Sequence, residues 1–192
     1  MRNRISEEIR AAEGKQKNMD FRQLKQDDAA GIAEMSAMAT EIVREHFDLI
    51  IGRAQNDYMI ARFQTEDAIR EQIAHGSQYF FVSDEGRRIG FLAFYSKGDA
   101  MYLSKFYLYR EERGKGYSIP MMDFVIQNAC SAGLSFIELN VNRHNDAICA
   151  YEQLGFEVIR TEKNDIGGGF FMDDYVYRLK IEKTEKHDTA DE

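Results

Sequence analysis

The 192-residue sequence contains no tryptophan, one proline and two cysteines. Two cysteines, Cys130 and Cys149, cannot form a disulfide framework, and no Cys/His cluster has the spacing of a zinc finger, so no metal site is expected. No apolar run approaches the roughly 20 residues that span a bilayer, and the charged N-terminal stretch lacks the apolar core of a signal peptide. We therefore expect a cytoplasmic protein that does not bind a membrane.

Basic residues are also outnumbered, 25 against 33 acidic ones, which gives a net charge of −8. This balance argues against a nucleic-acid binder held by phosphate contacts. The charge is unevenly distributed: residues 19–77 carry eleven acidic and six basic side chains, residues 161–192 carry nine and five, and residues 78–160 carry ten and nine. The nearly neutral middle therefore lies between two acidic flanks, and it leaves room for a local anion site.

No internal repeat and no Pro/Gly/Ser linker divides the chain, so a single domain is predicted over residues 19–183, with a polar N-terminal appendage over 1–18 and a polar tail over 184–192. Hydropathy patterns predict the element order β α α β β β α β α β β. The helices are expected over residues 27–46, 65–76, 118–133 and 146–154, and the strands over 19–24, 79–83, 88–95, 101–109, 136–141, 156–161 and 170–181. This order indicates an α/β (α+β) fold, with a mixed, mostly antiparallel sheet of about seven strands and helices on both faces.

The segment from Arg113 to Ser118, with the sequence Arg-Gly-Lys-Gly-Tyr-Ser, lies between a predicted strand and a predicted helix. Glycines let a ligand approach the backbone, a helix N-terminus offers free N–H groups, and Arg113 and Lys115 add positive charge, as in phosphate sites. Neither G-x-G-x-x-G nor G-x-x-x-x-G-K-[ST] occurs, so a dinucleotide or nucleoside triphosphate site is not indicated. A basic surface turn is the alternative interpretation.

A second pattern places Ala147, Tyr151, Gly155 and Phe156 along a predicted helix and its end. A tyrosine in this setting is either a packing residue with a satisfied hydroxyl or a proton donor. Together with the 113–118 loop, this pattern resembles the GNAT superfamily of acyl-CoA-dependent N-acyltransferases.

The superfamily's cofactor loop reads Q/R-x-x-G-x-G/A and is matched by Arg113–Ser118 except at its last position. Its later helix reads N-x-x-A-x-x-x-Y-x-x-x-G-F. Asn145 lies one residue too close to Ala147 for that pattern, and Asn142 is a competing candidate. The run over 165–176 also resembles a closing segment of a bacterial branch of the superfamily; a β-hairpin with a glycine tip is the other interpretation.

The resemblance implies that acetyl-CoA is the cosubstrate and that an amine attacks its thioester directly in a ternary complex. The strand over residues 105–108 would separate from its neighbour and offer backbone groups to the pantetheine arm, and Tyr151 would act as general acid on the departing thiolate. The implied cofactor-binding residues are Phe106, Tyr107, Leu108, Arg113, Gly114, Lys115, Gly116, Tyr117, Ser118, Asn145 and Tyr151.

No residue is indicated uniquely as the general base. Glu138 is one candidate, and Asp173 and Asp174 are others, although a solvated or structural carboxylate is the favoured interpretation of each. A chain of water molecules would also suffice. The four histidines occur singly, and none of them is predicted to be catalytic.

The resemblance places the acceptor site under residues 47–63, near His46, Arg53, Gln55, Asp57, Tyr58 and Arg62. A small primary amine is the expected acceptor, and the acidic flanks would attract a cationic, polyamine-like one, unless they serve only solubility. Two other functions stay open: a protein or peptide N-acetyltransferase, and a non-catalytic CoA-binding regulatory module. A homodimer through the edge strands or the C-terminal hairpin is compatible with the pattern.

Overall fold

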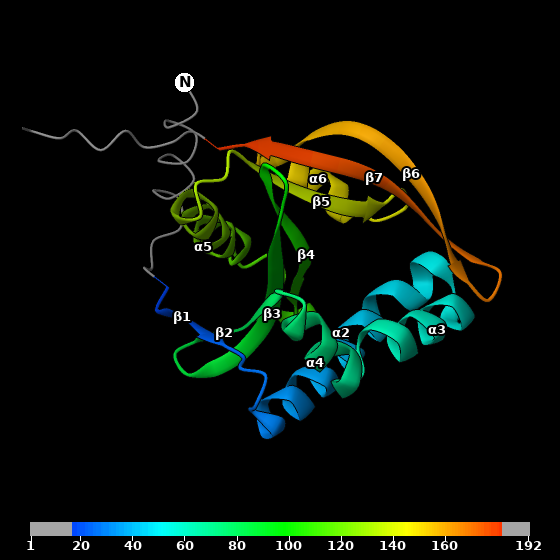
Figure 1. Cartoon of the computed structure of the whole chain (residues 1–192), viewed down its shortest axis with the longest axis horizontal. Helices are drawn as coiled ribbons and strands as arrows, with labels where there is room; N and C mark the ends of the chain where they lie inside the picture. Colours follow the sequence, from blue (N-terminus) through cyan, green and yellow to red (C-terminus); the bar gives the residue numbers. More distant parts are fainter. Residues whose placement is uncertain (1–16, 182–192) are drawn as a thin grey trace, which may run out of the picture.

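The computed structural model describes residues 17–181, so the predicted tail lies wholly, and the predicted appendage almost wholly, outside the described residues (Figure 1). The strands are β1 (Met19–Gln23), β2 (Gln78–Asp84), β3 (Arg87–Lys97), β4 (Ala100–Leu108), β5 (Phe136–Asn142), β6 (Glu157–Gly167) and β7 (Phe170–Lys180). The α-helices are α2 (Ala29–Ile51), α3 (Arg53–Phe63), α4 (Glu66–Ala74), α5 (Ser118–Ser131) and α6 (Ala147–Gln153), and a 3-10 turn, η1, covers Arg110–Glu112.

The strands form one seven-stranded sheet in the order β1-β2-β3-β4-β5-β7-β6. Its neighbouring strands pair antiparallel except for β4 and β5, which are parallel. The alternation of side chains along β2 explains how the sheet is covered: Phe80 and Val82 pack in one hydrophobic cluster with α5, and Tyr79 and Phe81 pack in another with α2 and α4. The predicted class, a mixed and mostly antiparallel sheet with helices on both faces, is confirmed (Figure 1).

The helical layer beside α2 differs from the prediction. Asp28 caps α2, because its Oδ1 accepts a hydrogen bond from the Gly31 N–H at 2.8 Å, but the helix continues to Ile51 rather than ending near residue 46. The helix α2 ends at Gly52, which has a φ of +80°, and α3 follows in a segment where no helix was predicted. Only Asn56 and Ile60 of α3 are buried, so its sequence lacks the apolar period that identifies a helix.

The C-terminal hairpin of β6 and β7 reaches across to α3 (Figure 1). The Tyr58 hydroxyl and the Arg62 guanidinium both donate to the Ile166 carbonyl, each at 2.7 Å, and the Gln55 amide donates to the Phe171 carbonyl at 2.7 Å. The predicted glycine loop is shorter than expected, since Gly167 belongs to β6 and only Gly168 and Gly169 form the turn. These hydrogen bonds hold α3 over the sheet, and we call this helix the α3 roof.

The path of β4 is set by its pairing with β3. Phe94 pairs with Leu103 and Ala93 pairs with Lys105, so Ser104 is an extra residue that forms a β-bulge. A bulge of this kind turns two successive side chains toward the same side of the sheet. On the other edge, β4 pairs with β5 only from Ala100 to Tyr102, so the two parallel strands separate beyond that point.

Candidate active site

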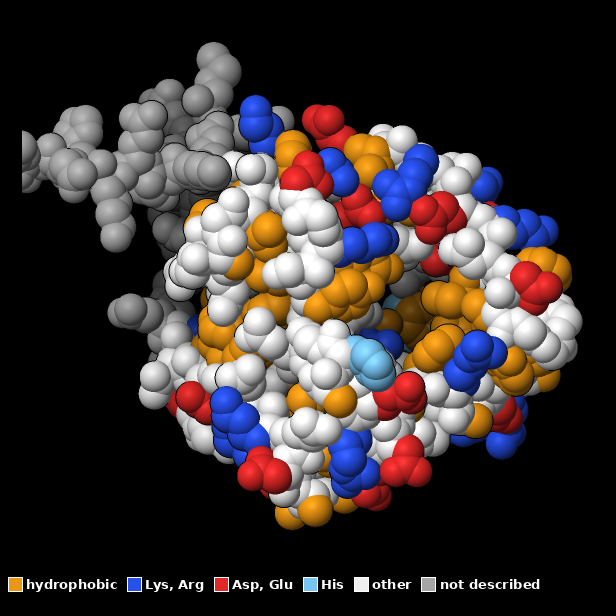
Figure 2. Space-filling view, in the orientation of Figure 1, with side chains coloured by type: hydrophobic (Ala, Val, Ile, Leu, Met, Phe, Trp, Pro, Cys, Tyr) orange, Lys and Arg blue, Asp and Glu red, His pale blue; other side chains and the backbone are white. Residues whose placement is uncertain are grey.

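Two cavities open where β4 leaves β5. The first, which we call the loop cavity, has a volume of about 800 Å³ and lies among the 113–118 loop, α6 and the end of α2. The second, the central cavity, has a volume of about 460 Å³ and lies between the sheet and α3. Figure 2 shows the molecule hollowed at this place, with hydrophobic side chains around the opening. Phe106, Tyr107, Asn145 and Tyr151 line both cavities.

The 113–118 loop presents its backbone to the loop cavity. Gly114 and Gly116 have φ values of +73° and +75°, which only glycine adopts without strain. The helix α5 that follows has no side-chain cap, so the first N–H groups of α5 are free to bind an anion. The geometry therefore suits a phosphate group at this helix end.

Three anchors below the loop fix its shape. Glu112 is 1% exposed and binds both Arg87 and the Lys115 ammonium, the latter at 3.2 Å. The Tyr117 hydroxyl donates to Asp84 Oδ2 at 2.6 Å. The Lys115 side chain is not among those that line the two cavities, and Tyr117 borders the loop cavity with its hydroxyl bound to Asp84.

A chain of polar contacts crosses from the loop to α6. An Arg113 Nη1 lies 3.3 Å from His46 Nδ1, His46 Nε2 lies 3.1 Å from Asn145 Oδ1, and the same oxygen accepts from the Ala147 N–H at 3.0 Å. Burial, followed by the nearby Arg113 charge, lowers the pKa of His46. A neutral His46 thus accepts from Arg113 and donates to Asn145. This positioning role depends on contacts between α2, the 113–118 loop and the turn before α6, and no local sequence pattern indicates it.

Asn145 and its competitor Asn142 occupy different places. Asn145 caps α6 and borders both cavities, whereas Asn142 lines the central cavity and accepts from the His144 N–H at 3.0 Å. Asn145, although one residue closer to Ala147 than the family pattern has it, is therefore the asparagine that binds the first N–H group of α6.

The open edge of β4 connects the two cavities. Beyond Tyr102 its backbone groups facing β5 have no strand partner, while β3 holds the other edge. Phe106, Tyr107 and Leu108, as expected from the sequence, border this gap. An extended amide-containing chain can pair there as an added strand would.

Tyr151 projects from α6 into the same gap. Its ring packs against Phe106 and Phe156, with centroids 6.3 Å and 5.7 Å away, and its hydroxyl has no hydrogen-bond partner among residues 17–181. Burial, with a smaller contribution from Tyr107, raises the pKa of Tyr151 above its usual value. The phenol is therefore protonated at neutral pH and available to donate.

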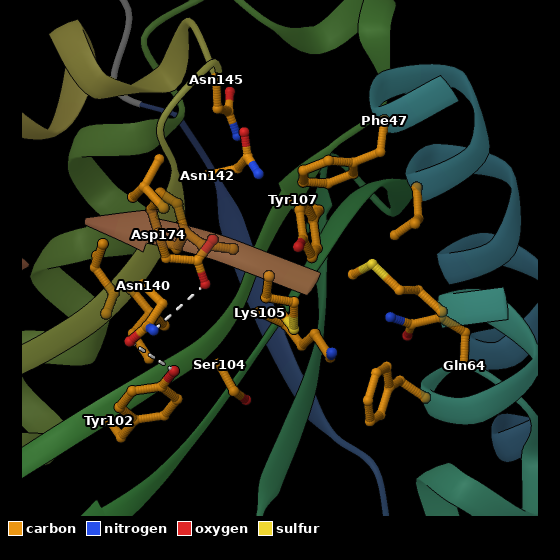
Figure 3. A pocket seen from close by; sticks show the side chains of 18 of the residues that line it. Phe47, Gln64, Tyr102, Ser104, Lys105, Tyr107, Asn140, Asn142, Asn145 and Asp174 are labelled. Atoms are coloured by element: carbon orange, nitrogen blue, oxygen red, sulfur yellow. Dashed lines mark hydrogen bonds between the residues drawn. The ribbon is translucent and has the colours of Figure 1, made fainter. Parts of the chain in front are cut away.

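Among residues 17–181, two charged side chains line the central cavity, Lys105 and Asp174, which Figure 3 labels. Asp174 is 4% exposed, and Asn140 donates to its Oδ2 at 3.4 Å. Burial is the main cause that raises the pKa of the Asp174 carboxyl, and the charges of Asp173 and Glu162 raise it further. The Asp174 carboxylate is thus a stronger base than an ordinary aspartate.

Glu138, the first base candidate from the sequence, lines neither cavity. Its carboxylate accepts hydrogen bonds from Arg160 at 3.0 Å and Arg178 at 2.9 Å. Burial would raise the pKa of Glu138, but these two hydrogen bonds lower it below its usual value. Glu138 is therefore a structural carboxylate by its position, and Asp173 is likewise paired, with Arg143 at 2.7 Å.

The segment expected over the acceptor site divides between two sides of α3. Gln55 lines the central cavity together with Phe47, Met59 and Phe63. Arg53 and Asp57 form ion pairs outside it, and Tyr58 and Arg62 hold the hairpin instead.

The sequence matches the family model described as an acetyltransferase (GNAT) domain over residues 52–172, which is more than half of the chain. The chain belongs to the GNAT acetyltransferase family. As a GNAT protein, it is an enzyme of the acyl-CoA-dependent N-acetyltransferase class. No curated protein sequence matches this GNAT chain.

Solved structures share the GNAT fold at low identity. The PaiA N-acetyltransferase of Thermoplasma acidophilum, in complex with coenzyme A, has a TM-score of 0.70 and 17% identity, covering 85% of this chain and 99% of its own. The spermidine N-acetyltransferase of Vibrio cholerae, with CoA and spermine, has a TM-score of 0.59 and 16% identity, covering 84% and 95%. The ribosomal-protein-S18-alanine N-acetyltransferase of Escherichia coli has the same TM-score and identity, covering 88% and 97%.

Two further properties of this GNAT chain concern the described residues only. None of the helices in residues 17–181 has the length and apolarity needed to cross a membrane. Within the same residues, no group of three or more His, Cys, Asp and Glu side chains is arranged to hold a metal ion.

The loop geometry predicts the effect of Gly116→Asp. A side chain at this position adds bulk and negative charge where the α5 N-terminus offers its N–H groups, so the variant should show no measurable CoA binding by isothermal titration calorimetry. Gly98→Asp is the matched control: Gly98 has a similar φ of +62° in the exposed β3–β4 turn, and this variant should bind CoA as the wild type does. Wild-type affinity in Gly116→Asp would contradict the assignment of the loop.

Proposed function

We propose that this enzyme transfers an acetyl group from acetyl-CoA to the primary amine of a small molecule, by direct attack in a ternary complex. The observation that carries the proposal is the position of Tyr151. This residue lies where the loop cavity and the central cavity meet, with a free hydroxyl, beside the open edge of β4.

The residues around the loop cavity fit coenzyme A. Gly114, Gly116 and Ser118 would offer backbone to the pyrophosphate, and Arg113 and Arg110 would add positive charge at its rim. The open backbone of Phe106–Leu108 would pair with the amides of the pantetheine arm and supply an N–H for the developing oxyanion. Acetyl-CoA supplies the activated acetyl thioester.

Tyr151 and Asp174 divide the proton transfers. Tyr151 would protonate the departing thiolate, and its raised pKa is compatible with this role because the donor must be protonated at the working pH. Asp174 would accept a proton from the acceptor amine, directly or through water, since it is the carboxylate that borders the central cavity. Its raised pKa makes this carboxylate a better proton acceptor than an exposed aspartate.

The central cavity favours a small acceptor over a protein segment. The α3 roof and the β6–β7 hairpin cover the cavity, and a volume of about 460 Å³ is typical of a small-molecule site. A bound spermine in the V. cholerae neighbour shows that this fold accommodates small amines. A purely regulatory module would have no need for an unpaired tyrosine hydroxyl in the junction.

The expectation of a polyamine-like acceptor receives less support. Acidic side chains of residues 19–77 are partly paired with basic residues from the middle of the chain, for example Glu34 with Arg88 at 2.9 Å. Among residues 17–181, one carboxylate, that of Asp174, borders the central cavity. The proposed function therefore specifies the acceptor only as a small primary amine.

Replacing Tyr151 by phenylalanine removes the proposed acid and keeps the ring contacts. We expect kcat to fall about a hundredfold while CoA affinity stays within about twofold of the wild type. Thiol release from acetyl-CoA with a panel of primary amines measures turnover, and calorimetry measures affinity. Tyr175→Phe, a half-buried tyrosine outside both cavities, is the control and should keep full activity. Unchanged turnover in Tyr151→Phe would remove Tyr151 from the acid role.

Replacing Asp174 by asparagine tests the base. In the wild type, activity should rise with pH as the Asp174 carboxyl loses its proton, at a pH above the usual carboxyl range because its pKa is raised. Asp174→Asn should lower kcat at least about tenfold and remove that step from the pH profile. Asp173→Asn changes the adjacent, surface-paired carboxylate and should keep the step, moved to lower pH because the Asp173 charge helps to raise the pKa of Asp174. A profile in Asp174→Asn identical to that of the wild type would assign the proton transfer to another group.

A further inference from the structure

Lys105 is a basic side chain in a place where the proposed reaction has no use for one. It lies on β4 and lines the central cavity, where the acceptor amine must enter. A positive charge there repels a protonated amine and contributes nothing to the leaving thiolate, which Tyr151 serves. Its presence therefore calls for a separate explanation.

The β-bulge at Ser104 explains how Lys105 reaches the cavity. Ser104 is the extra residue between two β3–β4 pairs, which shifts the alternation of side chains along β4 by one residue, and both Ser104 and Lys105 border the central cavity. Ser104 uses its hydroxyl within the sheet, donating to the Ala93 carbonyl at 3.1 Å. The ammonium group of Lys105 is thus the group that the bulge presents to a ligand.

The ammonium group has no partner in the protein. Among residues 17–181, Lys105 takes part in no hydrogen bond and no ion pair, and Asp174, the other charge in the cavity, is not paired with it. Burial lowers the pKa of Lys105 to about 8, so the side chain is still mostly protonated at pH 7. An unpaired charge in such surroundings is costly, and an anionic ligand would remove that cost.

A second unpartnered group lies on the opposite wall. Gln64 is 5% exposed, lines the central cavity, and has a side-chain oxygen with no hydrogen-bond partner. Figure 3 shows the Lys105 side chain extending from β4 toward the wall that carries Gln64, while Asp174 lies on the other side of Lys105, beside Asn140. The cavity therefore has an acidic side at Asp174 and a basic side at Lys105, with Gln64 on the wall beyond Lys105.

We propose that the acceptor carries a carboxylate as well as its primary amine, and that Lys105 binds this carboxylate. The inference rests on the proposed acetyl transfer and specifies its substrate class as amino acids in the broad chemical sense. Asp174 would face the amine and Lys105 the carboxylate, so the two charges of the cavity match the two charges of the ligand. A polyamine would meet an unpaired lysine and is disfavoured.

Matched pairs of amines test the proposal. The probes are phenylalanine, leucine, β-alanine and γ-aminobutyrate, each compared by thiol release with the amine that lacks its carboxylate: phenethylamine, isoamylamine, ethylamine and propylamine. Buffers without carboxylates are used. For at least one pair the wild type should have a higher kcat/KM for the carboxylate-bearing member, by at least about tenfold.

Lys105→Met tests the residue, because methionine has a similar length and no charge. This variant should raise KM for the carboxylate-bearing amine at least about tenfold and leave KM for its partner unchanged or lower. The comparison of variant with wild type cancels the difference in basicity between the two amines. Lys105→Arg should retain the preference, and Lys180→Met, at an exposed lysine outside both cavities, should not alter it.

Three results would overturn the proposal. The first is an equal or greater kcat/KM for the simple amine in every pair. The second is an equal loss for both members of a pair in Lys105→Met. The third is an intact mass showing that Lys105 itself becomes acetylated by acetyl-CoA, because Lys105 would then be the acceptor rather than the carboxylate binder.

Calorimetry with the carboxylate probes in the presence of CoA separates this proposal from the proposed function. If no amine releases thiol, the proposed acetyl transfer fails, while carboxylate binding that is lost in Lys105→Met still supports the anion site. If the simple amines are acetylated as well as the amino acids, the acetyl transfer is supported and the anion site is overturned.

Discussion

The separation of β4 from β5 is the constraint on which the rest of the molecule depends. These parallel strands pair over three residues and then diverge, because β3 holds β4 along its other edge and β7 holds β5 from Phe136 to Asn142. Each of the two strands is thus hydrogen-bonded along its length to an antiparallel neighbour. These pairs hold β4 and β5 in the sheet even where the two strands do not pair with each other. The gap exposes backbone groups that would be costly if they were buried and unpaired, so the opening is suited to a ligand that brings amides of its own.

The position of the gap also determines how charge is used. A net charge of −8 does not prevent the binding of one small polyanion, because the site uses backbone N–H groups, a helix end and a few local arginines. The buried Glu112 and the Tyr117–Asp84 hydrogen bond hold the loop from below, so its glycines keep their left-handed conformation facing the cavity. Within residues 17–181, the charged side chains that line the central cavity are Lys105 and Asp174. The net charge of the chain does not predict the sign or the place of either charge.

The sequence predicts the parts of the site that depend on local patterns. The loop between β4 and α5, the helix that carries Tyr151 and the order of the strands all follow from glycine spacing and apolar periods within short segments. The roof does not, because α3 buries only Asn56 and Ile60 and so has no apolar stripe to recognise. The presence of Lys105 and Asp174 in one cavity could not be predicted either. It depends on a one-residue bulge in β4 and on the pairing of β7 with β5, and no local sequence pattern indicates either feature.

A crystal structure of the enzyme with coenzyme A would show whether the β4–β5 opening receives the cofactor arm and brings its sulfur to the junction of the two cavities. We expect the pyrophosphate at the backbone of residues 114–118 and the pantetheine amides paired with β4 beyond Tyr102. The sulfur should lie within hydrogen-bonding distance of the Tyr151 hydroxyl. A cofactor arm that lies outside the gap, with its sulfur remote from Tyr151, would contradict this expectation.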